Sequence, residues 1–133
     1  MTKTQLQTDL DDVRARLANA PRDKQVIAEM WAYSSDLRRQ CQEHARAKSW
    51  YQREKSKVVV EARARGEKSA TAAEHEAESR DDIYQAHLAY RLAEQLIIAD
   101  RAALNVLHAE LDSIRTDRAD ARKADEFMVR EQT

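Results

Sequence analysis

The chain has 133 residues, of which 35% are charged and 5% aromatic, and its formal net charge is -1. This composition excludes a thick hydrophobic core, and the small net charge excludes a protein that binds nucleic acid over its whole surface. The only glycine and the only proline are Gly66 and Pro21. Phosphate-binding loops and nucleophile elbows need glycine, so we expect no enzyme, no catalytic residue and no cofactor.

Helix-breaking residues divide the chain into three predicted helices, at about residues 4–19, 23–65 and 71–128. In the first of these, apolar residues recur at helical spacing on one face: Leu6, Leu10, Val13 and Leu17. Pro21 ends this helix, because proline disfavours helix in the residue before it and suits the first turn of the helix after it. A kink and a full turn are both compatible with this sequence.

The second predicted helix has a mixed seam at heptad spacing. Its positions are Met30, Ser34, Leu37, Cys41, His44, Lys48, Tyr51, Lys55, Val58 and Ala62. Polar residues at such positions indicate either a partly solvated helix or one that sets register through buried polar groups. The lone Cys41 cannot form an intramolecular disulfide and suits a reducing compartment.

A hairpin turn is predicted at residues 66–70. Gly66 follows two arginines and is typical of a helix C-terminus, and Thr71 and Glu74 form a capping box that begins the third helix. At about 1.5 Å per residue, the second helix leaves about a quarter of the third unpaired, so the first helix or another subunit must cover this part.

The third predicted helix carries a broad apolar stripe, which predicts contacts with more than one neighbour. Leu88, Leu92, Leu96, Ala99, Ala103 and Val106 widen it. We predict oligomerisation through Ile83, Tyr90, Ile97, Leu104, Leu107, Leu111 and Ile114. The expected fold is one all-α domain over residues 1–133, a long helical hairpin or coiled coil with a short N-terminal helix, which self-associates.

A basic arm lies between Leu37 and Lys68, with ten basic residues against four acidic ones. Cations neutralise phosphates, and aromatic rings stack on unpaired bases, so this arm predicts binding to single-stranded nucleic acid. The predicted binding residues are Trp50, Tyr51, Arg53, Lys55, Lys57, Arg63, Arg65 and Lys68. The alternative is a solvated helical face with its aromatic residues in the core.

Metal and catalytic motifs are absent from the sequence. None of the four histidines follows a glutamate by three positions, so the di-iron pattern is missing, and His75 begins a zincin-like segment that lacks a second histidine. We expect no metal site. No apolar run approaches the roughly 20 residues that cross a bilayer, and the first residues lack a signal peptide's apolar segment, so we expect a cytoplasmic protein without membrane contact.

Three segments resemble the UvsY-like phage recombination mediators. Tyr33, Ser34 and Leu37 match an upstream position of that family, and residues 111–116 are similar to its C-terminal helix. The segment that resembles its basic helix motif is Lys57-Val58-Val59-Val60-Glu61-Ala62-Arg63-Ala64. Arg63 matches an arginine that contacts DNA in the family, whereas Glu61 stands at a lysine position. The nearby Lys55, Lys57, Arg65 or Lys68 would then have to supply the positive charge that the family's lysine provides.

The resemblance implies a small all-helical protein that forms ring-like bundles of six or seven subunits. It also implies a recombination mediator without catalytic activity, which binds single-stranded DNA and promotes loading of a RecA-type recombinase in the presence of a single-strand-binding protein. The expected location is the cytoplasm of a bacterial host. The alternative is a coiled-coil scaffold or adaptor that joins protein partners and does not bind nucleic acid.

Overall fold

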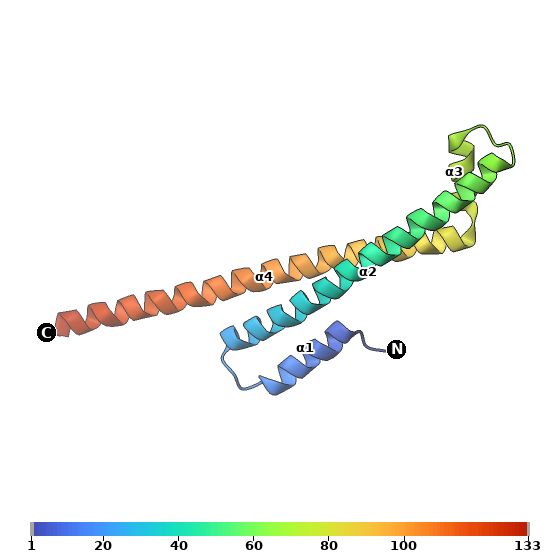
Figure 1. Cartoon of the computed structure of the whole chain (residues 1–133). Coiled ribbons are helices and arrows are strands. Elements are labelled where there is room, and N and C mark those ends of the chain that lie inside the picture. Colours follow the sequence, from blue (N-terminus) through green and yellow to red (C-terminus); the bar gives the residue numbers. More distant parts are fainter. Residues whose placement is uncertain (1, 133) are drawn as a thin grey trace. The chain divides into compact units, whose positions relative to one another are not determined.

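The computed structural model describes residues 2–132, and within this range the chain is all-α, without strands. Figure 1 shows its four helices: α1 (Gln5–Arg16), α2 (Arg22–Ala64), α3 (Ala70–Ser79) and α4 (Asp81–Gln132). The predicted all-α fold class is confirmed. The coiled coil and the ring stay predictions.

The contacts divide the chain into two compact units. Unit 1 contains α1, the start of α2 up to Asp36, and α4 from Asp100 onward. Unit 2 is Leu37–Ala99, which contains the rest of α2, all of α3 and the start of α4.

Pro21 marks a full turn between α1 and α2, the second of the two possibilities that the sequence leaves open. The helices end at Arg16 and begin again at Arg22. Gln25 stabilises this turn from inside α2, since its side-chain Nε2 donates to the carbonyl oxygens of Leu17 at 2.9 Å and Ala20 at 3.2 Å. The turn allows α1 to lie beside the start of α2 in unit 1 (Figure 1).

The predicted hairpin turn is present and depends on Gly66. Its φ of 105° lies in the left-handed region that L-residues rarely adopt. The Gly66 amide donates to the Arg63 carbonyl and the Glu67 amide to the Ala62 carbonyl, each at 3.1 Å, which is the Schellman pattern for a helix C-terminus. The N-cap of α3 is Ser69 rather than Thr71, because the Ser69 hydroxyl accepts from the Ala72 amide at 3.2 Å.

The third helix predicted over residues 71–128 is two helices in the structure. The break lies at Arg80, whose backbone is extended, with φ -76° and ψ 134°. Asp81 and Asp82 follow it in the first turn of α4, and the Asp82 carboxylate accepts from the Ile83 amide at 3.0 Å. Acidic residues stabilise a helix N-terminus, so this pair favours a new helix start over continuation of α3.

Each unit has a small core of its own. In unit 1, Val26 of α2 packs with Leu107 and Leu111 of α4. Two ion pairs join the same two helices: Arg22 to Glu110 at 2.6 Å and Arg118 to Asp23 at 2.7 Å. In unit 2 the core cluster contains Tyr51, Val58, Ala77, Ile83 and Ala86.

The seven residues predicted to join subunits are covered within the chain. Ile83, Ile97, Leu107 and Leu111 are buried, and the other three are half-buried. Other large apolar side chains of α4 remain exposed: Tyr84, Leu88, Leu92, Leu96, Ile98 and Val106. These exposed side chains, together with Phe127, Met128 and Val129, are the apolar surface that α4 offers to a partner. The predicted oligomerisation residues stay a prediction.

Candidate nucleic-acid interface

Several basic residues of α2 in unit 2 lie on the side of the helix opposite its buried face. Successive residues of an α-helix are rotated by about 100°, which places Arg46, Arg53, Lys57 and Arg63 away from the buried side that carries Tyr51. All four basic side chains are exposed. We call this set of four residues the basic face.

The carboxylates of the same helix lie on a separate edge. By the same rotation, Glu43, Glu54 and Glu61 fall within about 20° of one another, between the basic face and the buried side. No acidic residue occupies the sector between Arg46 and Arg63. Part of the local excess of positive charge therefore lies on a sector of α2 without carboxylates.

Two residues of the basic face take part in weak ion pairs with this edge. Arg46 lies 3.7 Å from the exposed Glu43, and Lys57 lies 3.2 Å from Glu54, whose side chain is 24% exposed. Arg53 and Arg63 enter none of the ion pairs found among residues 2–132. Pairs on a helix surface contribute little, so Arg46 and Lys57 can exchange their carboxylate partners for phosphates.

The two aromatic residues predicted to stack on bases have different environments. The Trp50 side chain is 58% exposed and, by the same rotation, lies between the basic face and the carboxylate edge. Tyr51 is only 8% exposed, and its ring stacks on His87 at 4.5 Å and on Tyr90 at 5.5 Å between centroids. Trp50 is therefore open to a ligand, whereas Tyr51 belongs to the packing between α2 and α4.

The remaining predicted residues lie away from the basic face. Lys55 is directed to α3, with its Nζ 3.2 Å from an oxygen of Glu78, and Arg65 forms an ion pair with Glu76 of α3. Lys68 is exposed in the turn between α2 and α3. Of the eight predicted residues, Trp50, Arg53, Lys57 and Arg63 are exposed on the side of α2 away from Tyr51.

Arg46 is a member of the basic face that the sequence-based selection omitted. It lies seven residues before Arg53, which is two helical turns. This spacing could have identified it, because residues seven apart lie on the same side of a helix.

Glu78 is the centre of a polar cluster at the end of α3. It accepts a hydrogen bond from the Tyr51 hydroxyl, and its second carboxylate oxygen lies 3.5 Å from Nδ1 of His87. Burial acts to raise the pKa of Glu78, but the hydrogen bonds from Tyr51 and Lys55 outweigh it and the pKa is lowered. Burial and the bond to Glu78 raise the pKa of Tyr51.

We expect Glu78→Gln to weaken unit 2 at neutral pH and to have little effect in acid. A lowered pKa in the folded state means that the ionised carboxylate stabilises the fold above its unfolded pKa, and that this contribution is lost as pH falls through the folded pKa. The difference in unfolding free energy from wild type should be at most about 1 kcal/mol near pH 7 and should be smaller near about pH 3, because it decreases as pH falls below the unfolded pKa. Urea titrations at both pH values measure it, and an equal loss at both would contradict this role for the ionised form.

Other chemical sites are not apparent in the described residues. Within residues 2–132 no three His, Cys, Asp or Glu side chains lie close enough to hold a metal ion. Over the same range, no helix is both long and apolar enough to cross a membrane. The Cys41 side chain is exposed.

Comparison of the chain with protein-family models, with curated proteins and with solved structures finds no significant match. The resemblance to recombination mediators therefore depends on the short motifs described above.

Proposed function

We propose that the chain binds single-stranded DNA through the basic face and Trp50, without catalytic activity. The observation that carries this proposal is a set of four exposed cations on the side of α2 opposite its buried face, bordered by an exposed indole. From Arg46 to Arg63 the row extends about 26 Å at 1.5 Å per residue, long enough to follow several nucleotides of an extended strand. Cationic tracks that carry aromatic stacking positions are typical of proteins that bind single strands without sequence preference.

Trp50 favours an unpaired strand over a duplex. An aromatic side chain stacks on a base only when that base is free of its neighbours, and such stacking is worth about 1–3 kcal/mol per base. In a duplex the bases are paired and stacked, so Trp50 could not stack on them and only the phosphate contacts would remain. A scaffold protein with a basic surface could make the same phosphate contacts.

The biological role that we propose is that of a recombination mediator. The motif resemblance supports loading of a RecA-type recombinase onto DNA that a single-strand-binding protein covers, in the cytoplasm of a bacterial host. A homo-oligomer, such as a ring of six or seven subunits, would repeat the basic face. Multivalent attachment of this kind raises affinity by orders of magnitude without any new contact.

A second candidate function is a scaffold or adaptor that joins proteins only. The exposed apolar residues of α4 in unit 2, Leu88, Leu92 and Leu96, favour it, because contiguous exposed apolar surface marks protein contacts. In that case the basic face would meet an acidic protein surface.

Titration of labelled oligo-dT at two salt concentrations separates the two functions. Neutralising four phosphates of a single strand gives a slope of about -2.8 in log affinity against log salt, so affinity should fall roughly 50-fold between about 50 mM and about 200 mM salt. Absence of binding at both concentrations would refute DNA binding and leave the scaffold.

A further inference from the structure

Unit 1 contains an open hollow of about 360 Å³ between α2 and α4, which we call the α2–α4 hollow. Four apolar side chains from the two helices line it: Ile27, Met30, Trp31 and Leu111. The Trp31 side chain is 70% exposed, so its indole surface is open. Tryptophan and arginine are enriched among the residues that carry binding energy at protein interfaces, so an exposed indole in a hollow is a candidate contact for a partner.

The polar lining of this hollow has one permanent cation and no carboxylate. It consists of Ser34, His108 and Arg115. Arg115 is exposed and enters none of the ion pairs found among residues 2–132. Asp112 lies three residues before Arg115, but it neither lines the hollow nor pairs with that guanidinium. The lining therefore suits one apolar group that carries one negative charge.

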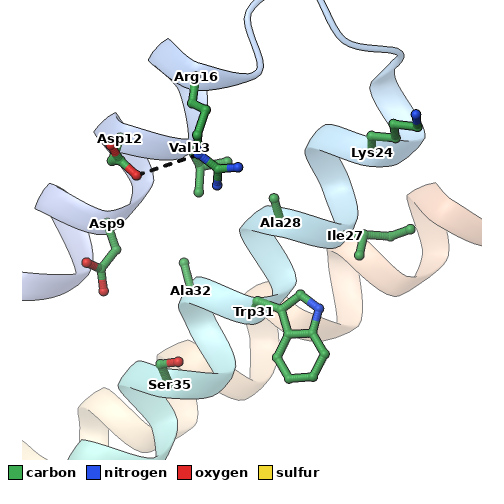
Figure 2. A pocket seen from close by; sticks show the side chains of 10 residues that line it. All are labelled: Asp9, Asp12, Val13, Arg16, Lys24, Ile27, Ala28, Trp31, Ala32 and Ser35. Carbon is green, nitrogen blue, oxygen red and sulfur yellow. Dashed lines mark ion pairs between the residues drawn. The ribbon is translucent and has the colours of Figure 1, made fainter.

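A second open surface beside Trp31 has no such preference. Ile27 and Trp31 also border a groove of about 520 Å³ between α1 and α2, which we call the α1–α2 groove (Figure 2). Two acids and two bases line this groove: Asp9, Asp12, Arg16 and Lys24. Its formal charges cancel, so, unlike the α2–α4 hollow, it indicates no partner of a particular charge.

We propose that the α2–α4 hollow binds the C-terminus of a partner protein whose last residue is large and apolar. The side chain of that residue packs against Trp31 and Leu111, and its terminal carboxylate pairs with Arg115, whose guanidinium can donate two parallel hydrogen bonds. Leu111 and Arg115 are four residues apart, about 6 Å along α4. A C-terminal residue fits this short span because it carries its side chain and its carboxylate on one Cα atom.

This proposal does not depend on DNA binding, because the hollow belongs to unit 1 and the basic face to unit 2. An NMR titration of the full-length chain without DNA tests it. Trp50→Phe leaves Trp31 as the only tryptophan, so its indole N–H gives a single signal. The probes are acetyl-Gly-Phe with a free carboxylate, the same peptide as its amide, and acetyl-Gly-Ser with a free carboxylate.

The acid form of acetyl-Gly-Phe should shift the Trp31 signal at millimolar concentration. Its amide should bind about fivefold more weakly, because it cannot form the ion pair with Arg115. The serine peptide should bind at least about tenfold more weakly, because it has no apolar side chain to bury in the hollow.

Arg115→Gln on the same background should remove the preference for the acid over the amide. The matched control is Arg101→Gln, which removes the same charge from another exposed position of α4 in unit 1 and should keep the preference. Both arginines are exposed, so neither substitution disturbs a core.

An unmoved Trp31 signal, equal affinities for acid and amide, or loss of the preference in Arg101→Gln as well as in Arg115→Gln would each overturn the proposal. A shift caused by oligo-dT and not by the peptide would assign the hollow to nucleic acid, and would overturn it too.

Discussion

Replacing Arg53, Lys57 and Arg63 together with glutamine is expected to lower the affinity for oligo-dT roughly 100-fold at about 50 mM salt. The three cations neutralise phosphates, and each phosphate contact with a single strand contributes about 0.7 to the salt slope, so the slope should also fall by about 2. Fluorescence anisotropy of a labelled oligonucleotide at several salt concentrations measures both quantities.

The matched control removes the same charge from other surfaces of the chain. Arg91, Arg101 and Arg115 are exposed residues of α4, outside the basic face. Their joint replacement with glutamine should leave most of the affinity intact. Equal losses in the two triple variants would show that net charge alone attracts DNA, and would contradict a site on α2.

The second large effect concerns the core of unit 2. Ile83→Ala should lower the free energy of unfolding by about 2–5 kcal/mol, because the side chain is 1% exposed and its removal leaves a cavity beside Tyr51 and Val58. Chemical denaturation followed by circular dichroism measures the loss.

Ile98→Ala is the control, since it makes the same chemical change in the same helix at a side chain that is 54% exposed. Its effect should be within about 0.5 kcal/mol of wild type, as for most surface substitutions. Similar losses in the two variants would indicate that Ile98 is also buried in the folded assembly and that the two faces of α4 have been assigned wrongly.

The sequence alone predicts the features that depend on single residue types. One glycine and one proline predict long helices, and both residues lie at turns as expected: Gly66 has a positive φ that favours glycine, and Pro21 directly precedes α2. These are local effects, which need no knowledge of the tertiary contacts.

The break at Arg80 is harder to predict, because neither glycine nor proline marks it. Two features favour the break. The Asp81–Asp82 pair stabilises a new helix start, and the packing of α3 buries Ala73 and Ala77 completely. Tertiary packing of this kind overrides the helical propensity of the surrounding residues. The start of α3 was also hard to predict, since Ser69 caps this helix two residues before the predicted Thr71.

The candidate interface was predicted in part. Periodicity can place Arg53, Lys57 and Arg63 on one face and the glutamates on another, since both follow from the helical rotation. It cannot separate Trp50 from Tyr51, because which of two adjacent aromatic residues is buried depends on His87 and Tyr90, more than 30 residues later in the chain. For the same reason, the ion pairs of Lys55 and Arg65 with α3 follow only from the tertiary structure.

Emission of Trp50 during an oligo-dT titration tests the central claim most directly. The chain has two tryptophans, so Trp31→Phe leaves Trp50 as the only indole while keeping an aromatic ring in the α1–α2 groove. If bases stack on Trp50, its fluorescence should be quenched with the same midpoint that anisotropy of the labelled DNA gives, and duplex DNA should quench it far less. Unchanged emission on addition of oligo-dT would contradict the account, whether or not the DNA binds elsewhere on the chain.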